Sequence, residues 1–389
     1  MTNRWLLPEN IADVLPHTSH LVEQLRREAI DLSISYGYEL VIPPMMEFIE
    51  SLLTSTGSDM DLQTFKLVDQ MSGRTLGLRA DMTTQVARID AHILNRQHIA
   101  RLCYAGTTLQ TRVRPGIFSR EQLQFGAEIY GYPGIQADIE IVRLMIGTLH
   151  LAQVGPVTLD VSHAGLLQDI LHQKNLDAAD ISAVYQFLQA KDRSGLFTLM
   201  SGWDAEAKQT IMSLLDLSGD ADEVLQAARL ALPQTQLSQR VLSDLDMFCQ
   251  GVRANLPEVA INIDLADLDG YQYHTGILCA GYVPNYPVAI ARGGRYDQVG
   301  QAFGRSRAAT GFSVDLLALA GLSNRKFNSH AILAPWDDSV GLKQTIAQLR
   351  QAGEVVIESF PLEAHDESSM ICDRRLVLQN DIWQIEPIR

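Results

Sequence analysis

The first 165 residues alternate between stretches with the 3.6-residue period of a helix and stretches with the two-residue period of a strand. Apolar side chains recur at helical spacing from Leu21 to Leu32, and Thr18 or Ser19 is placed to cap that helix. "YELVIPPMMEF" predicts a strand ended by two prolines, because proline cannot donate to a sheet ladder. Alternation between residues 101 and 130 predicts two antiparallel strands joined by the loop "LQTRVRPGIF".

A short strand and a helix are predicted in "TLGLRADMTTQVARIDAHIL", residues 75 to 94. Asp81 stands where the N-cap of this helix is expected. One face of the helix is predicted to carry Met82, Val86, Ile89 and Ile93. A further helix is predicted over residues 138–151, followed by a strand in "PVTLDVS".

The patterns divide the chain into four parts, which agrees with a length of 389 residues that exceeds one comfortable hydrophobic core. Residues 1–165 form the first part of a mixed core, and residues 166–256, where strand patterns vanish, form an inserted helical subdomain. Strand patterns resume over residues 257–325 and complete the core. Residues 326–389 are predicted to form a small α/β C-terminal domain.

The composition of the chain bears on its ligands, its location in the cell and the role of its cysteines. The 31 Lys and Arg residues against 46 Asp and Glu give a net charge of -15, which argues against nucleic acid as the main ligand. The start of the chain lacks the pattern of a signal peptide and no apolar run is long enough to span a membrane, so the cytoplasm is the expected location. The cysteines have no spacing typical of a disulfide framework or a zinc site, and we expect small buried apolar residues at Cys103, Cys249, Cys279 and Cys372.

"EQLQFGAEIY" has the most informative polar pattern. Its apolar residues face one side of the predicted sheet, and its other side carries Gln122, Gln124, Gly126, Glu128 and Tyr130. This polar face could hold a small ligand bearing an ammonium or imidazole N–H, with Gly126 leaving room between Gln124 and Glu128. A solvent-exposed sheet face explains the same alternation and is favoured by the pattern alone.

Three other features allow a structural and a functional interpretation. Asp81 is a helix cap or a ligand contact. "GGRYD", residues 293–297, is a glycine-rich turn between strands or a backbone segment close to a ligand. The aromatic residues around His274, including Tyr273, are more typical of sheet packing than of a cofactor site.

Seven segments resemble, in order and spacing, the catalytic domain of histidyl-tRNA synthetase, a class II aminoacyl-tRNA synthetase, over about residues 8 to 320. They are "PENIADVLP", "YGYELVIPPMMEF" as motif 1, "LRADMTT", "YAGTTLQTRVRPGIFSREQLQFGAEIYG" as motif 2, "DGYQYHTGILCAGY" as the histidine-specific loop, "GGRYD" and "GFSVDLLAL" as motif 3. The resemblance implies an α+β fold: a class II synthetase-like antiparallel sheet of six strands flanked by helices. It also implies a dimer interface formed partly by motif 1.

The chain departs from that family where the synthetase contacts ATP. Gln110 replaces the motif 2 arginine for the α-phosphate, and Arg112 stands where the family has a glutamate. Ala318, preceded by Leu317, replaces the arginine of motif 3, and Asp269 replaces the arginine of the histidine-specific loop. Loss of one preorganised donor commonly costs about a hundred- to a thousandfold in rate, so three losses predict no useful synthetase activity.

The positions that resemble the family's histidine pocket keep suitable side chains. Carried over residue by residue, the implied histidine-binding set is Asp81, Thr83, Gln124, Glu128, Tyr273 and His274, although His274 departs from the more usual tyrosine. The resemblance therefore favours ligand binding over a solvent-exposed face for this side of the sheet.

A histidine pocket without the ATP arginines resembles the regulatory subunit of ATP phosphoribosyltransferase. That resemblance implies a non-catalytic partner of a short-form catalytic subunit in the first step of histidine biosynthesis, typically in a hetero-octamer. It also implies self-dimerisation through motif 1, histidine as a feedback effector, and no cofactor. The C-terminal part is acidic rather than basic, which agrees with lost tRNA binding and leaves assembly as its possible role.

The sequence is also compatible with two other functions. A divergent amino-acid-activating ligase would need other phosphate contacts, for which the sequence offers Arg112, Arg114 and Arg120; we interpret the first two as hairpin or interface residues. A free histidine-binding or RNA-associated module would have no enzyme partner, and co-purification with a short phosphoribosyltransferase would distinguish it.

Overall fold

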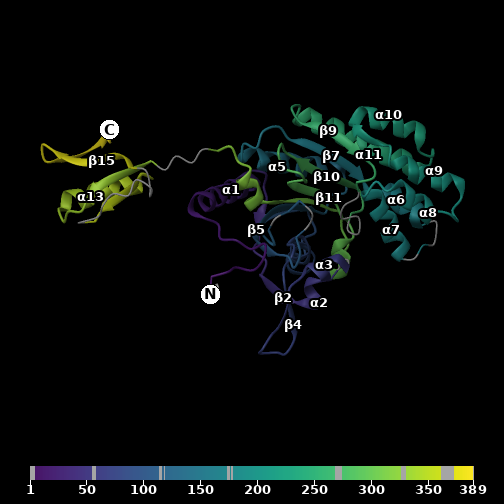
Figure 1. Cartoon of the computed structure of the whole chain (residues 1–389), viewed down its shortest axis with the longest axis horizontal. Helices are drawn as coiled ribbons and strands as arrows, with labels where there is room; N and C mark the ends of the chain where they lie inside the picture. Colours follow the sequence, from purple (N-terminus) through teal and green to yellow (C-terminus); the bar gives the residue numbers. More distant parts are fainter. Residues whose placement is uncertain are drawn as a thin grey trace. The chain divides into compact units, whose positions relative to one another are not determined.

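The computed structural model describes residues 5–54, 58–113, 116–117, 119–172, 176, 178–267, 274–325, 330–360 and 372–388. The chain divides into two compact units, Met1–Asn324 and Arg325–Arg389 (Figure 1). Each unit has its own hydrophobic cluster of buried residues.

The first unit is built on one large sheet, which has nine strands in the described part of the chain. Their spatial order is β1 (Glu39–Leu40), β5 (Ala100–Leu109), β6 (Glu121–Tyr130), β12 (Ala309–Asp315), β11 (Ala291–Arg295), β10 (Ile277–Tyr282), β7 (Thr158–His163), β9 (Ala260–Asp264) and β8 (Ser218–Asp220). The six strands from β5 to β7 pair antiparallel, as expected. The expected count of six is nevertheless wrong for the whole sheet, because β1 and β9 add parallel at its two sides and β8 extends it further.

One face of this sheet packs on helices. Phe125, Ala127 and Ile129 of β6 are buried there, as their alternation predicts, in one cluster with residues of α1 (Pro16–Ser35), α5 (Ile135–Leu151) and α12 (Leu316–Gly321). The opposite face is covered at one end by α4 (Thr83–Arg88), which packs against Leu102 and Tyr104 of β5. The polar face of β6 is therefore buried as well, and the interpretation as a solvent-exposed face is wrong.

Six helices lie at one end of the first unit (Figure 1). They are α6 (Ala164–His172), α7 (Ala178–Gln189), α8 (Arg193–Leu199), α9 (Ala205–Leu214), α10 (Ala221–Ala231) and α11 (Gln236–Asn255). The expectation that this stretch lacks strands is wrong, because β8 lies within it and pairs with β9. Its core residues Leu245 and Phe248 belong to the same cluster as the sheet, so a separate inserted subdomain stays a prediction.

Two helix starts differ from the expectation. Helix α1 begins at Pro16 with Leu15 as N-cap, and Ser19 Oγ donates to the Pro16 carbonyl rather than capping the helix. Proline suits this position because the first turn needs no amide donor. Helix α4 begins at Thr83, so Asp81 lies outside it and accepts from the Thr83 amide at 2.7 Å. The π-helix η1 (Ile89–Leu94) follows, and its wider turn leaves Ile93 59% exposed instead of buried.

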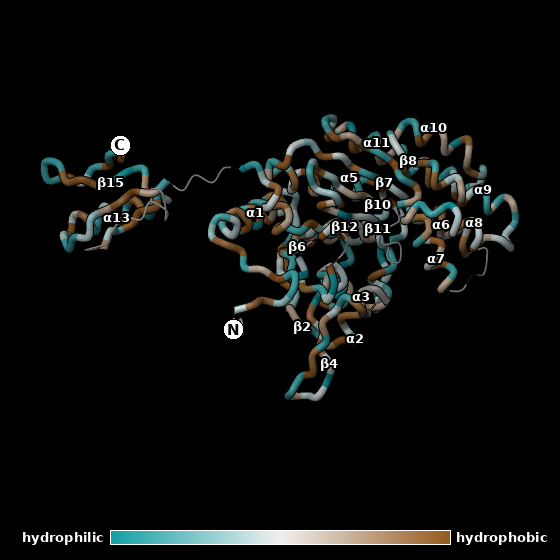
Figure 2. The backbone as a smooth tube through the Cα atoms, viewed as in Figure 1, coloured by the Kyte–Doolittle hydropathy of each residue, from teal (hydrophilic) through white to brown (hydrophobic). Residues whose placement is uncertain are grey.

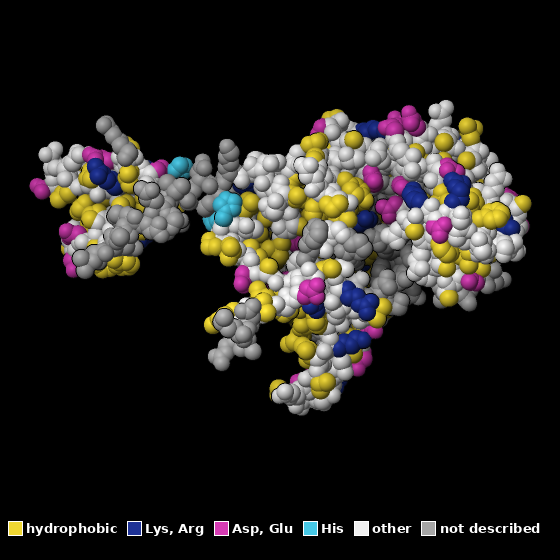
Figure 3. All heavy atoms as spheres, viewed as in Figure 1, with side chains coloured by type: hydrophobic (Ala, Val, Ile, Leu, Met, Phe, Trp, Pro, Cys, Tyr) yellow, Lys and Arg dark blue, Asp and Glu magenta, His cyan; other side chains and the backbone are white. Residues whose placement is uncertain are grey.

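A small second sheet follows motif 1. Instead of one strand ended by prolines, "YELVIPPMMEF" forms β1 before the prolines and β2 (Met46–Phe48) after them. β2 pairs with β4 (Thr75–Leu78), which pairs with β3 (Lys66–Val68), and the short helices α2 (Ile49–Leu52) and α3 (Ser58–Gln63) lie between β2 and β3 in the chain. Hydrophobic segments run through this sheet (Figure 2), and hydrophobic side chains gather on its surface (Figure 3). Met46 and Phe48 of β2 are exposed, as is Ile42, which precedes β2 in the chain.

In its described residues, the second unit is a four-stranded sheet with one helix, in agreement with the predicted α/β pattern. The strands are β14 (Val355–Ser359), β13 (Ala331–Pro335), β15 (Cys372–Gln379) and β16 (Ile382–Pro387), and the helix is α13 (Val340–Gln351). The helix contributes Leu342 and Ile346 to the core. Cys103, Cys249 and Cys279 of the first unit are buried as expected, but Cys372 is half-exposed, which corrects the prediction for that residue.

Candidate ligand-binding site

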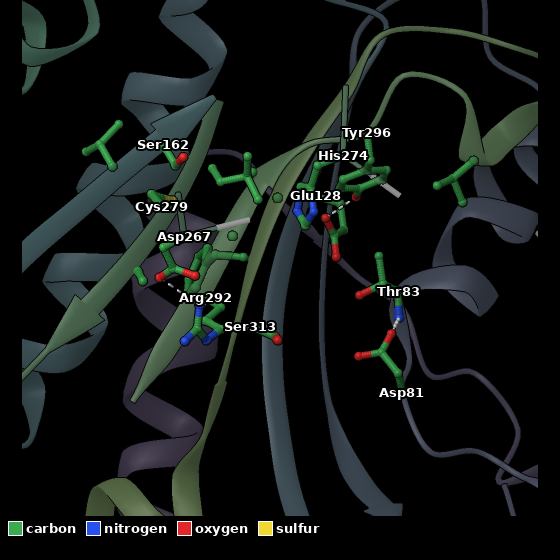
Figure 4. A pocket seen from close by; sticks show the side chains of 18 of the residues that line it. Asp81, Thr83, Glu128, Ser162, Asp267, His274, Cys279, Arg292, Tyr296 and Ser313 are labelled. Atoms are coloured by element: carbon green, nitrogen blue, oxygen red, sulfur yellow. Dashed lines mark hydrogen bonds and ion pairs between the residues drawn. The ribbon is translucent and has the colours of Figure 1, made fainter. Parts of the chain in front are cut away.

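The polar face of the large sheet forms the floor of a cavity of about 220 Å³. Sites for drug-sized ligands are commonly about 300–1,000 Å³, so this cavity suits a smaller molecule. The described residues that line it lie in or beside β6, β7 and β9 to β12, the start of α4, helix α3 and the short helix η2 (Val299–Phe303), and Figure 4 shows most of them from close by. Among them are Asp81, Thr83, Glu128, Asp160, Ser162, Asp264, Asp267, His274, Arg292, Tyr296 and Ser313.

Glu128 is held by two tyrosines that the sequence interpretation missed. Tyr104 of β5 donates to Glu128 Oε1 at 2.9 Å, and Tyr296, directly after β11, donates to Glu128 Oε2. The Tyr104 hydroxyl is also 3.2 Å from Thr83 Oγ1, which extends the network to α4. The sequence signals for them were the place of Tyr296 in "GGRYD" and that of Tyr104 at the start of the motif 2 segment, and neither indicated a bond to Glu128.

Two glycines make room for this arrangement. A Cβ atom at Gly126 would lie 2.4 Å from the Tyr104 hydroxyl, so the space above Gly126 holds the tyrosine and not the ligand that we expected between Gln124 and Glu128. A Cβ atom at Gly311 would lie 1.4 Å from Glu128 Oε2. Glu128 can therefore occupy this position only because the facing strand β12 has no side chain there.

Burial changes the protonation of Glu128. The side chain is 1% exposed, and this desolvation raises its pKa to about 8, although the hydrogen bonds from Tyr296 and Tyr104 oppose the shift. Burial also raises the pKa of both tyrosines well above the ordinary value, so they remain hydrogen-bond donors. A cation that enters the cavity would favour the ionised carboxylate.

Asp81, Thr83 and Gln124 come together at the α4 side of the cavity. Gln124 Nε2 donates to Asp81 Oδ2 at 2.6 Å, and Gln124 Oε1 accepts from the Met82 amide at 2.9 Å. Asp81 and Thr83 line the cavity, whereas Gln124 is buried behind them. The geometry therefore gives Gln124 the task of orienting the Asp81 carboxylate.

His274 lines the same cavity next to β11. A Cβ atom at Gly294 would lie 2.7 Å from the His274 ring, so this glycine provides the space for the imidazole. "GGRYD" is not a turn, because Gly293, Gly294 and Arg295 belong to β11. Tyr273 lies outside the described residues.

Helix α4 also connects the cavity to the small sheet. Gln85 Nε2 and Arg88 both donate to Glu47 Oε1 of β2, at 2.8 and 2.6 Å. Thr83, in the first turn of the same helix, lines the cavity.

The positions of the missing ATP contacts hold no cation that faces the cavity. The Gln110 side chain is buried and lies 3.4 Å from the Ala80 carbonyl, and Ala318 packs against the main core. Arg120 donates to the Gln110 carbonyl and stacks over Phe65, and Arg112 is exposed outside the cavity lining. Asp269 and Arg114 lie outside the described residues.

Acidic groups dominate the cavity. Its described lining includes five carboxyl groups but, among cationic side chains, only Arg292 besides His274. Such a lining repels phosphate groups and attracts cations. Among the described residues, no three histidine, cysteine or acidic side chains are grouped to hold a metal ion, and no helix is long and apolar enough to cross a membrane.

The fold and the cavity define a class II synthetase-like protein, and comparisons with known proteins agree. Residues 10–319 match the family model described as histidyl-tRNA synthetase, and residues 329–386 match the ATP phosphoribosyltransferase subunit HisZ C-terminal domain. A curated protein of Polynucleobacter asymbioticus, an ATP phosphoribosyltransferase regulatory subunit, is 53% identical over 384 residues, which cover 99% of each chain. The chain belongs to the family of ATP phosphoribosyltransferase regulatory subunits.

Solved structures of related proteins have the same fold. A Bacillus halodurans structure, described as an ATP phosphoribosyltransferase regulatory subunit/histidyl-tRNA synthetase, superposes with a TM-score of 0.82 at 25% identity and covers 94% of this chain and 95% of its own. Histidyl-tRNA synthetase from Nostoc sp. gives a TM-score of 0.77 at 20% identity, covering 96% of this chain and 91% of its own, which supports the fold alone. The predicted fold class and family are therefore confirmed.

Proposed function

We propose that this chain is a regulatory subunit without adenylation activity of its own, which activates a short-form ATP phosphoribosyltransferase catalytic subunit and makes it sensitive to histidine. The family supports the catalytic partner. The Glu128 network carries the histidine part of the proposal, because it holds a buried carboxyl group, bonded to Tyr104 and Tyr296, at a cavity whose described lining is mainly acidic.

In the proposed complex, the ammonium group of histidine pairs with Asp81 and Glu128. Thr83 accepts or donates a hydrogen bond at the same side, Gln124 holds Asp81, and His274 lies beside the imidazole. An ammonium group suits this cavity because the carboxyl groups of Asp81 and Glu128 both line it.

We further propose a hetero-octamer with the catalytic subunit, in which this chain dimerises through motif 1. The exposed apolar side chains of Ile42, Met46 and Phe48 support a covered surface in this region. The coupling between histidine and the catalytic subunit would be about 1–3 kcal/mol, the usual range for allosteric coupling.

Replacement of Glu128 tests the histidine site. We expect Glu128→Ala to raise the histidine concentration for half-inhibition of the assembled enzyme by roughly tenfold or more, because a hydrogen-bonded charge pair is lost. Activation of the catalytic subunit without histidine should stay within about twofold. Glu121→Ala, in the same strand but outside the cavity lining, is the matched control. Unchanged feedback in Glu128→Ala would remove this carboxyl from the proposed site.

ATP–pyrophosphate exchange tests the proposed absence of adenylation. We expect no histidine-dependent exchange, because Gln110 and Ala318 supply no positive charge for the phosphates. Exchange that requires histidine and disappears in Glu128→Ala would instead support the divergent ligase.

A further inference from the structure

The cavity extends well beyond Glu128. Across the sheet, Glu128 pairs with Gly311, Gly311 with Gly294, Gly294 with Leu278, and Leu278 with Ser162. These four steps, at a strand spacing of about 4.8 Å, separate the β6 and β7 ends of the floor by about 19 Å. Opposite residues in antiparallel strands share a face, so both ends belong to the same floor (Figure 4).

A single amino acid cannot fill both ends. Bond lengths near 1.5 Å make histidine roughly 7 Å long, which is less than two strand spacings. A ligand bound at Glu128 therefore leaves the β7 end of the cavity available.

The β7 end of the cavity contains a buried hydroxyl group whose hydrogen-bonding capacity is unused within the described residues. Ser162 is 4% exposed and lines the cavity, and its hydroxyl has no hydrogen-bond partner within the described residues. Buried polar groups in proteins are nearly always paired, and an unpaired one costs free energy that a bound ligand would recover.

The charges around Ser162 select the kind of ligand. Asp160, Asp264 and Asp267 line this end, while Arg292 approaches Asp267 at 3.9 Å and Lys191 pairs with Asp264 at 2.7 Å. Three negative and two positive groups leave one negative charge. The acidic groups in the described structure are not arranged to hold a metal ion, which points to an organic monocation.

We propose that the β7 end is a second ligand subsite, formed by Ser162, Asp160, Asp267 and Arg292, which binds the ammonium group of a small organic amine. An ammonium group has donors only, and it would donate to the Ser162 hydroxyl and the Asp160 carboxylate. Phosphorylated and carboxylated ligands are disfavoured because the net charge of this end is negative. The inference concerns a second ligand and goes beyond the proposed histidine function.

Calorimetric titration of the full chain with n-butylammonium at pH 7 tests this subsite. We expect saturable binding that weakens roughly tenfold or more in Asp160→Asn and several-fold in Ser162→Ala. Thr108→Val is the matched control, because it removes another buried hydroxyl without a partner in the described structure, but from a position outside the cavity lining. Circular dichroism of each variant checks that it is folded.

Further titrations distinguish this subsite from the Glu128 site. Butylammonium should still bind Glu128→Ala, n-butanol should bind much more weakly than butylammonium, and Ser162→Ala should keep its affinity for histidine within about twofold. Unchanged butylammonium binding in Ser162→Ala and Asp160→Asn would overturn the inference. Binding lost only in Glu128→Ala, equal binding of butanol, or no saturable binding would also overturn it.

Discussion

Burial favours the neutral form of Glu128. Its carboxyl is almost fully buried, and this desolvation raises its pKa to about 8 against the opposing effect of the hydrogen bonds from Tyr104 and Tyr296. At neutral pH the empty site therefore holds mainly the carboxylic acid. In the proposed function, a ligand with an ammonium group must displace this proton when it binds.

The affinity for histidine should therefore depend on pH. Only about a tenth of Glu128 is ionised at pH 7 and about half at pH 8, so we expect the affinity to rise about fivefold over this range. Calorimetry at the two pH values measures the change, and proton release should be visible as a dependence on the ionisation enthalpy of the buffer. In Glu128→Gln this increase should be absent; its persistence would assign the proton to another group.

The residues of the site were only partly predictable. Alternation in residues 121–130 indicates which face Glu128 occupies, because the period of a strand is local. Tyr104 and Tyr296 are 24 and 168 residues away along the chain, and only the strand order brings them to the carboxyl. Gln124 was predicted as a ligand contact from resemblance, whereas the geometry gives it a bond to Asp81.

At the scale of elements, the end of β7 packs against α11 through a buried histidine. His163 accepts from the Gly165 amide at Nδ1, and its Nε2 is 3.9 Å from Asp244 of α11. Burial lowers its pKa to about 4, with further lowering by Arg240 and Arg295. Burial at the β7–α11 contact therefore favours the neutral imidazole.

Acid should weaken this contact. The pKa of His163 is about 4 in the folded chain and 6.5 in the absence of burial, so between these pH values the unfolded chain binds a proton that the folded chain does not. The free energy of unfolding therefore decreases as the pH falls from 6.5 towards 4. The full loss is roughly 3 kcal/mol, at about 1.4 kcal/mol per pKa unit. Glu128 acts in the opposite direction, so denaturant unfolding of the wild type and His163→Gln should be compared at each pH. Parallel pH profiles would contradict the assignment to His163.

Elements were predicted best where the pattern is long. The β5–β6 pair and α5 agree with their alternation and helical period. The three-residue strand β8 was missed because its residues, Ser-Gly-Asp, have no strand propensity and depend on pairing with β9. The exposed Ile93 was missed because a π-helix changes which side chains share a face.

On the scale of the whole molecule, the described cavity belongs to the first unit. The described residues that line the cavity lie between Met60 and Ser313, and the second unit has a separate small core. The sequence predicted the change to an α/β pattern near residue 326, because a helical period is flanked there by short apolar strands. The parallel pairing of β1 with β5 and of β9 with β7 was not predictable, because it depends on which strands become neighbours in the folded sheet.

A chain ended after Asn324 should therefore keep its ligand site. We expect its affinity for histidine to stay within about twofold of the full chain, because the described cavity residues and their supporting clusters are retained. Calorimetry measures the affinity, and Glu128→Ala in the same shortened chain provides the negative control. A folded shortened chain that binds no histidine would place part of the site in the second unit.

Two glycines on the cavity floor provide the space that polar side chains of this chain occupy. Gly311 leaves the volume in which the Glu128 carboxyl lies, and Gly294 does the same for His274. A relative that retains the acidic residue but carries alanine at the position of Gly311 must hold its carboxyl elsewhere. Among natural relatives, sensitivity to the ligand should therefore depend on glycine at the position of Gly311 as strongly as on the acidic residue at the position of Glu128.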